Sequence, residues 1–373
     1  MTPRIALVAH RLAAPQPTGI GRYYQEIAPA LAALTASGAP YRYVAAAPRE
    51  PDQPEWVRPP LEYVAIPGPR RLVQAAWTLA YRPRVDRALG RPALVHVLHP
   101  WAPVPTRAPL VVTFHDLFPI THPEWGRPDE GLALQRGMRY ARDHAGAIVA
   151  ISEWTADQVC EHLDVERDRV SVVHMGIGDE FRAPPAADEV AAACDRHGVT
   201  PGAYLICVGG LTARKNIDTV LRAVAELDPA RGGALPVLVT GPAGREPDAR
   251  TDRLRAVGFV SRLELVALLR GARALVHPSR GEGFGFTPLE AMAVGTPALV
   301  SNAGALPEAV GDAAVLLDPD DVDAWAAAIE RIVTDPDHRA GLVERGVTRQ
   351  AGFRWDRAAA ETMEVHRRVL ESR

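Results

Sequence analysis

Residues 279–290 read SRGEGFGFTPLE, and this stretch is the most informative part of the chain. It follows a short apolar run at 274–277 that has the length of a buried strand, and it leads into TPLEAMAVG, which has the pattern of a helix start. Thr287 is the predicted N-cap and Pro288 the predicted first helical residue. Open α/β sheets bind ligands where the carboxyl end of a strand meets a helix N-terminus. The stretch therefore predicts an α/β fold with a ligand site at this turn.

The glycines and glutamates of the stretch indicate the kind of ligand. Gly281, Gly283 and Gly285 let the backbone approach a ligand closely, and N–H groups at the positive end of a helix dipole bind phosphate. Glu290 is expected about one turn into the helix and on the side of the ligand site, because a helix face comes round again after about one turn. Glu282, in the preceding loop, is expected at the same site. Carboxylates accept hydrogen bonds from sugar hydroxyls. A Gly-rich turn before a helix is common in α/β proteins, so this motif alone leaves a purely structural role open.

Length and composition limit the class of protein. With 373 residues, 47% of them hydrophobic, the chain is long enough for two domains with separate cores. A formal net charge of −3, with basic residues spread widely, does not indicate nucleic-acid binding, so a small ligand is expected. The three cysteines lack metal-ligand spacing, which predicts reduced thiols. No segment predicts a signal peptide or a spanning helix, which favours a cytoplasmic protein.

Strand and helix patterns alternate through both halves of the chain, as in βαβ units. A break in composition at 182–188 (RAPPAAD) separates the halves, and 355–370 has the i, i+3, i+4 spacing of an amphipathic helix. The predicted domains are a Rossmann-like domain over 1–182, a second over 183–352, and a C-terminal helix over 353–373 that crosses back to the first. The predicted strands cover 5–9, 43–47, 94–98, 110–114, 147–151, 170–173, 204–208, 237–240, 256–260, 274–277, 298–301 and 314–317.

A second turn of the same kind follows the predicted strand at 204–208. It reads GGLTARKN, in which Gly209 and Gly210 make a tight turn and Arg214 and Lys215 come just before a predicted helix at 217–226. Two cations beside a helix N-terminus favour a diphosphate. Of 42 cationic residues only Lys215 is a lysine, and its compact charge on a flexible stem suits a phosphate. A solvated surface pair is the alternative for these two cations taken alone.

Together the two turns resemble the family-4 glycosyltransferases of the GT-B fold, whose signature is a glutamate, seven residues and a second glutamate, as in Glu282 and Glu290. The resemblance implies two Rossmann-like domains facing across a cleft. It implies transfer of a hexose, with retention of anomeric configuration, from a UDP- or GDP-sugar to a hydroxyl of a glycan, lipid-linked or small-molecule acceptor. No metal or other cofactor is expected. Further stretches match family landmarks in order: TGIGRYYQE, VVTFHDLFPITHPEW, AISEWT, VVHMGIG and SNAGALPEAVGDAAVLLDPDD.

The resemblance also implies roles for residues of the second domain. Glu282 would hold hydroxyls of the donor sugar and Glu290 those of the ribose. Arg214 and Lys215 would hold the diphosphate, whose negative charge grows as the glycosidic bond breaks. Gly210 departs from the family pattern, because many members have Arg or Thr there, and this leaves the phosphate more to the two cations. The backbone would supply further donor contacts at Gly209, Gly210, Gly283, Phe284, Gly285, Phe286 and Thr287.

In the first domain, Gly19 and Gly21 would form a flexible loop near the donor phosphate and the acceptor. A dinucleotide fingerprint fails here, because the position three after Gly21 is a tyrosine. His115 directly follows the predicted strand at 110–114, and the resemblance places it near the transferred sugar. A lone histidine at a strand end is otherwise more often a structural hydrogen-bonding group. The acceptor side would include Gly21, Arg22 and Asp116.

Two other patterns have competing interpretations. Residues 318–321 (DPDD) resemble a metal-binding motif, but they directly precede a predicted helix at 322–333, so helix capping is the better interpretation. Residues 70–91 are basic and include Trp77 and Tyr81. They allow a peripheral contact with the inner face of the membrane or an acceptor-phosphate site, although a solvated helix face is the simpler interpretation.

Two alternative functions remain open from the sequence. A nucleotide-sugar epimerase of the same architecture would consume the donor without an acceptor. A non-catalytic nucleotide-sugar-binding protein would bind the donor without transfer. The sequence identifies neither the base, the sugar and the acceptor nor the oligomeric state.

Overall fold

A computed structural model describes residues 2–10, 19–49, 57, 59–126, 128–231, 233–242 and 252–372. The chain divides into two compact units, one formed by Met1–Gly176 with Arg354–Arg373 and the other by Ile177–Phe353. The change of unit therefore falls after Gly176, whereas the sequence placed it after Arg182. The short helix α6 (Asp179–Arg182) packs on α9 (Arg262–Gly271) and α10 (Phe286–Ala293), which ties it to the second unit.

The first unit is built on a parallel sheet with the strand order β3-β2-β1-β4-β5-β6-β7. Its inner strands β1, β2, β4, β5 and β6 are buried along most of their length and consist mostly of apolar residues, whereas the edge strands β3 and β7 are only partly buried. The strand order reverses between β1 and β4, and the carboxyl ends of these strands border the switch point where such sheets bind ligands. The strands are β1 (Arg4–Val8), β2 (Arg42–Arg49), β3 (Glu62–Pro69), β4 (Leu94–Val97), β5 (Leu110–Phe114), β6 (Ala147–Ala150) and β7 (Val170–Val172).

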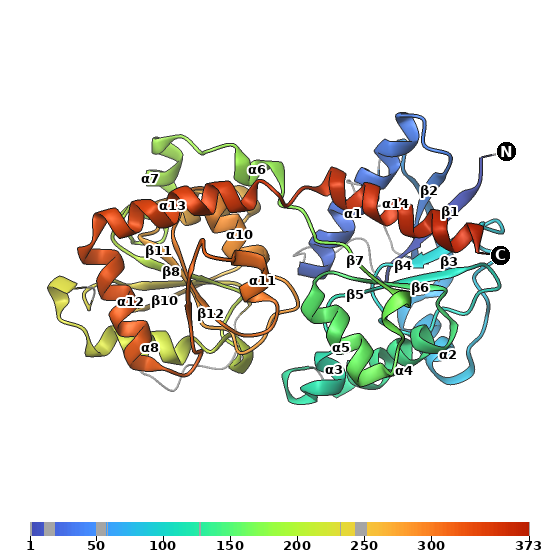
Figure 1. Cartoon of the computed structure of the whole chain (residues 1–373), viewed down its shortest axis with the longest axis horizontal. Helices are drawn as coiled ribbons and strands as arrows, with labels where there is room; N and C mark the ends of the chain where they lie inside the picture. Colours follow the sequence, from blue (N-terminus) through green and yellow to red (C-terminus); the bar gives the residue numbers. More distant parts are fainter. Residues whose placement is uncertain are drawn as a thin grey trace. The chain divides into compact units, whose positions relative to one another are not determined.

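The C-terminal helix α14 (Trp355–Glu371) belongs to the first unit and runs along α1 (Gly19–Ala36) (Figure 1). Its buried side chains recur with i, i+3, i+4 spacing from Ala358 to Val369, which confirms the predicted amphipathic helix that crosses back. The other helices of this unit are α2 (Arg70–Ala80), α3 (Phe118–Thr121), α4 (Pro128–His144) and α5 (Glu153–Leu163).

The second unit repeats the doubly wound plan with the strand order β10-β9-β8-β11-β12-β13, again all parallel. Its switch point lies between β8 and β11, the two strands that precede the two glycine-containing turns. The strands are β8 (Leu205–Val208), β9 (Val237–Thr240), β10 (Leu254–Gly258), β11 (Ala274–His277), β12 (Ala298–Ser301) and β13 (Val315–Leu317). The remaining helices are α7 (Ala187–Arg196), α8 (Ile217–Glu226), α11 (Leu306–Val310), α12 (Val322–Thr334) and α13 (Pro336–Gln350).

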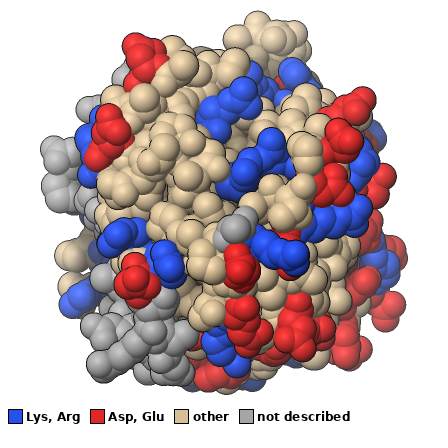
Figure 2. Space-filling view, turned by 90° about the vertical axis from the view of Figure 1, so that its left-hand side faces the viewer, with Lys and Arg blue, Asp and Glu red and all other residues tan. Residues whose placement is uncertain are grey.

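The surface carries both signs of charge. Figure 2 shows basic and acidic side chains on the same face, with acidic ones along its lower and right-hand edges. All three cysteines are free thiols. No helix in the described ranges is both long enough and apolar enough to cross a membrane.

Candidate functional site

Two loops meet at the switch point of the second sheet. One follows β8 and contains Arg214 and Lys215, and the other follows β11 and contains the Gly-rich stretch. The Nη1 atom of Arg214 donates a hydrogen bond to the carbonyl of Gly281 at 2.7 Å. The amide of Arg280 donates to the carbonyl of Arg214 at 2.8 Å. The structure thus brings together the two turns that the sequence predicts for one ligand.

The carboxylate of Glu282 lies at the centre of this junction. Its Oε1 atom is 2.7 Å from Lys215 Nζ and 3.4 Å from His277 Nε2, and its Oε2 atom is 2.8 Å from Arg214 Nη1. Burial by itself would raise the pKa of Glu282, but Lys215 and Arg214 hold that pKa well below its ordinary range. Glu282 is therefore ionised at neutral pH and is bonded on both oxygens.

The cluster has an excess of positive charge. It contains two cations, Arg214 and Lys215, against one carboxylate, and burial together with Lys215 lowers the pKa of His277 so that its imidazole stays neutral. The lysine is 8% exposed, which is rare for an ammonium unless a counter-ion holds it. With the N-terminus of α10 alongside, the cluster suits a ligand that carries more than one negative charge.

Gly209 makes room for the lysine. Its φ of +122° lies in the region that favours glycine, and a Cβ atom there would lie 2.4 Å from Lys215 Cε and 2.8 Å from Lys215 Nζ. The side chain of Lys215 therefore lies directly on the Gly209 backbone on its way to Glu282. No other residue type at 209 leaves the ammonium where it is.

Replacing Gly209 by alanine is expected to displace the ammonium and to lower turnover. The backbone strain at positive φ should also cost on the order of 1–3 kcal/mol of folding stability. Gly198→Ala is the matched control, because Gly198 has a φ of +64° but nothing within 4 Å of a built Cβ. Urea unfolding and steady-state turnover separate the two effects. Equal turnover of the two variants would contradict this role for Gly209.

The helix after the Gly-rich stretch begins earlier than predicted. Helix α10 starts at Phe286 with Gly285 as its N-cap, so the assignment of Thr287 as N-cap and Pro288 as first residue is wrong. Amides of the first helical turn need no intrahelical partner, so proline is tolerated at the third position. Glu290 lies one turn into the helix, as expected, and is 2% exposed.

Two residues of this site were not predicted. Gly304, at a φ of +61°, lets its backbone approach Glu282, and a Cβ there would lie 2.5 Å from the Glu282 carbonyl oxygen, which accepts from the Ala305 amide at 2.9 Å. His277 is the other, and its position in the sequence could have predicted it. It is a polar residue at the carboxyl end of a predicted strand, the same position that singled out His115.

His115 directly follows β5 in the first unit and is 5% exposed. Burial lowers its pKa to about 4, so the imidazole is neutral at physiological pH. Its Nε2 atom lies 3.0 Å from the carbonyl of Leu98. A carbonyl only accepts, so Nε2 carries the proton and Nδ1 is left as an acceptor. The rings of Tyr23 and His99, neither of them predicted, pack edge-on to His115 at 4.8 and 5.5 Å between centroids.

The other predicted residues of the first unit have local roles. Asp116 accepts a hydrogen bond from the Phe118 amide at 3.1 Å, which orders the turn after β5. The expected loop at Gly19 and Gly21 is wrong, because both glycines lie in the first turn of α1, as does Arg22 soon after them. The buried tyrosines that follow favour this early helix start, since helical spacing places them on the core face.

The aspartate motif at 318–321 is a helix cap, as predicted. Asp321 is the N-cap of α12 and accepts from the Ala324 amide at 3.0 Å, and Asp320 pairs with Arg280 at 2.5 Å. Within the described ranges, no three His, Cys, Asp or Glu side chains are grouped so that they could hold a metal ion.

Comparison with known proteins identifies the family. Residues 17–181 match the family described as Glycosyltransferase Family 4, and residues 197–349 match that described as Glycosyl transferases group 1. A D-inositol 3-phosphate glycosyltransferase of Salinispora arenicola is 31% identical over 318 residues, which cover 76% of this chain and 70% of that protein. The chain belongs to the family-4 glycosyltransferases. Its two sheets are those of the GT-B fold, which confirms the predicted fold class.

Other known proteins are similar along most of the chain. The O-antigen chain mannosyltransferase B of Escherichia coli is 29% identical over 266 residues, covering 69% of this chain and 70% of its own. Among solved structures, Anabaena HepE in complex with UDP-glucose has a TM-score of 0.72 at 15% identity, covering 97% of this chain and 99% of HepE. At that identity the likeness concerns the fold. This glycosyltransferase thus has its Glu282 cluster at the switch point of its second sheet.

Proposed function

We propose that this glycosyltransferase moves a hexose from a UDP- or GDP-sugar to an acceptor hydroxyl, with retention of configuration and without a metal ion. The observation that carries the proposal is the buried contact of Glu282 with Lys215 and Arg214 at 2.7 and 2.8 Å. It preorganises two cations beside a helix N-terminus. The names of mannosyltransferase B and of HepE with UDP-glucose also favour a nucleotide-linked hexose.

The cations act on the leaving group. When the bond from the sugar C1 to the phosphate oxygen breaks, negative charge develops on the diphosphate, and Lys215 and Arg214 stabilise it at that moment. The acceptor oxygen forms its bond to C1 on the same face, and its proton passes to the departing phosphate oxygen. This front-face reaction needs no carboxylate nucleophile. The excess positive charge of the cluster takes the place that a divalent cation would have.

The polar groups around the cations have complementary roles. Glu282 accepts hydrogen bonds from the donor sugar, Glu290 from the ribose, and the amides of Gly283 to Thr287 contact the phosphates and the sugar. In the first unit, Nδ1 of His115 accepts from a hydroxyl of the transferred hexose. The acceptor lies toward Arg22 and Asp116.

The anomeric configuration of the product tests the proposed reaction. We expect proton NMR of the product to show the anomer of the donor, and turnover to be the same with and without EDTA. Inversion would contradict the front-face mechanism, and a loss with EDTA that magnesium or manganese restores would contradict metal independence. An epimerase would change the donor sugar without any acceptor, and a binding protein would leave it intact.

We also propose that this protein contacts a membrane peripherally through α2 and α4. Of the large apolar side chains that the described part of the chain leaves exposed, half lie on or next to these two neighbouring helices. Leu72 and Leu79, 67% and 70% exposed, are two turns apart on one face of α2. A solvated helix face would be polar here, so this surface favours the membrane contact over the simpler interpretation. Tyr81 at 46% and Leu132 at 58% complete the apolar set.

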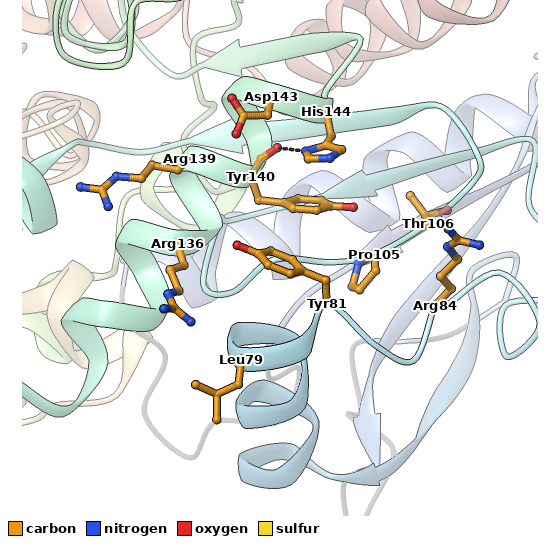
Figure 3. Close-up of a pocket in the computed structure, with 10 residues that line it drawn as sticks. All are labelled: Leu79, Tyr81, Arg84, Pro105, Thr106, Arg136, Arg139, Tyr140, Asp143 and His144. Atoms are coloured by element: carbon orange, nitrogen blue, oxygen red, sulfur yellow. Dashed lines mark hydrogen bonds between the residues drawn. The ribbon is translucent and has the colours of Figure 1, made fainter.

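A cationic cavity adjoins this apolar face. It has a volume of about 700 Å³ and an aromatic wall, in which Tyr81 stacks on Tyr140 at 5.6 Å and Tyr140 on His144 at 4.1 Å (Figure 3). The acidic residue in its lining, Asp143, pairs with Arg142 at 2.7 Å. Apolar side chains beside arginines that form no ion pair with the described residues suit an anionic lipid surface. The cationic side chains that line the cavity are Arg84, Arg136 and Arg139.

Vesicle sedimentation tests the membrane contact. We expect the protein to bind vesicles that contain phosphatidylglycerol, to bind vesicles of phosphatidylcholine poorly, and to be released by salt. Leu79→Glu should remove most of the binding. Leu263→Glu is the matched control, because Leu263 is equally exposed at 74% but lies on α9 of the second unit. No binding to anionic vesicles, or equal losses in the two variants, would contradict the contact.

A further inference from the structure

A chain of buried hydrogen bonds crosses the first unit from its C-terminal helix to α1. His366 Nε2 of α14 lies 2.9 Å from His96 Nδ1 of β4, and His96 Nε2 lies 2.8 Å from Thr113 Oγ1 of β5. Thr113 Oγ1 in turn lies 3.2 Å from the hydroxyl of Tyr23 in α1. We call these four residues the α14 relay. They are between 0% and 3% exposed, and segments 270 residues apart in the chain meet in it.

The relay ends against His115. The ring of Tyr23 is edge-on to the His115 ring, with 4.8 Å between centroids and 82° between planes. Trp355, the first residue of α14, lies on another side of Tyr23, with 6.0 Å between ring centroids. The C-terminal helix thus reaches Tyr23 twice, once by packing and once through hydrogen bonds. Tyr23 is the side chain that closes one side of the His115 ring.

The tautomers of the two histidines in the relay depend on each other. Burial holds the pKa of His96 well below its ordinary value and that of His366 at about 3, so both imidazoles are neutral. Each neutral imidazole has one N–H, and Nε2 of His366 faces Nδ1 of His96. A bond between them requires the same tautomer in both rings, either Nε2–H in both or Nδ1–H in both. The bonds of the relay therefore support one another in one direction.

We propose that His366 is a positioning residue for His115 and acts on it through the α14 relay. Because the proposed function assigns His115 to the transferred sugar, the catalytic part of this proposal rests on that function. The phenol of Tyr23 is held by Thr113, Thr113 is held by His96, and His96 is held by His366. Loss of the His366 imidazole releases the Tyr23 ring and with it the orientation of His115. The geometry explains why a histidine lies on the buried face of α14.

Two variants and a control test the relay. Tyr23→Phe removes its last hydroxyl, and His366→Leu removes its first imidazole. Tyr204→Phe is the control, because Tyr204 is a fully buried tyrosine of the second unit whose hydroxyl donates to the Leu268 carbonyl. We expect kcat to fall about tenfold in the two relay variants with donor KM little changed, as for misplaced catalytic groups, while Tyr204→Phe keeps its turnover. All three should lose some thermal stability.

Imidazole nitrogen NMR gives a readout that does not depend on turnover. In the wild-type protein, His96 and His366 should be the same neutral tautomer. The ring resonances of His115 should shift in both relay variants and stay in place in Tyr204→Phe. Different tautomers for His96 and His366 would overturn the relay, and unmoved His115 resonances with unchanged kcat would overturn its positioning role. Absence of transfer in the wild-type protein would overturn the proposed function. The imidazole resonances of His96, His366 and His115 would still test the relay, because they do not depend on turnover.

Discussion

Replacing Lys215 or Glu282 by alanine is expected to lower turnover at least about a hundredfold, since removal of one preorganised group from a developing charge costs that much in other enzymes. Lys215→Ala leaves the pair of Arg214 and Glu282 intact, at 2.8 Å. Glu282→Ala leaves two cations beside each other without their carboxylate. We therefore expect Glu282→Ala to lower the free energy of unfolding by about 3–5 kcal/mol, as for a broken buried pair. Lys215→Ala should lower it by less.

Arg280→Ala is the control for these two variants. Arg280 lies in the same loop, but its guanidinium pairs with Asp320 at 2.5 Å and is 39% exposed. Its loss removes a cation from the neighbourhood without touching Glu282. Steady-state kinetics and thermal unfolding of the three variants would be compared. Near-normal turnover of Lys215→Ala, or an Arg280→Ala that is equally impaired, would contradict the assignment of the leaving-group site.

Mild acid is expected to destabilise the first unit strongly. Burial lowers the pKa of four of its histidines, to about 4 for His115, to about 3 for His366, and well below the ordinary value of 6.5 for His96 and His99. Below pH 6.5 the unfolded chain binds protons that the folded chain cannot bind, so stability is full above 6.5 and falls as the pH decreases toward the folded values. Linkage gives about 1.4 kcal/mol for each histidine between about pH 7.5 and about pH 5.5, or about 5 kcal/mol for the four.

Urea unfolding at these two pH values measures the effect. Tryptophan fluorescence reports mainly on the first unit, because six of the seven tryptophans fall within its residue ranges. His366→Gln removes one titrating group and should reduce the pH dependence by about 1.4 kcal/mol. Carboxylates change little in this window, since their ordinary pKa values lie near 4. Equal stability at the two pH values would show that the histidines are not buried as neutral groups.

Most of the fold could be predicted because buried parallel strands are short apolar runs. The strands β5, β9, β11 and β12 begin and end where the sequence predicts. Strand β3 was missed, because EYVAIPGP is broken by proline and glycine. Helix α7 was missed because its start, within RAPPAAD, resembles a linker. Local sequence cannot show which apolar face a neighbouring element will cover.

The site could be predicted only in part. The positions of Glu282 and Lys215 at strand ends are local features, and the sequence shows them. Their ion pair joins residues 67 apart, and which atoms meet depends on how two loops pack. The α14 relay spans 270 residues between His366 and His96, and no spacing rule connects those two histidines. Long-range polar contacts of this kind follow from the three-dimensional structure alone.

The most direct test of the central claim is donor binding at the Glu282 cluster. Thermal unfolding would be followed with UDP-, GDP- and dTDP-sugars for the wild-type protein, for Lys215→Ala and for the Arg280→Ala control. A ligand at about 100 times its Kd adds about 2.7 kcal/mol of stability. We predict that a UDP- or GDP-sugar raises the Tm of the wild-type protein and of Arg280→Ala but not that of Lys215→Ala. A shift of the same size in all three proteins, or no shift with any of the sugars, would contradict the account.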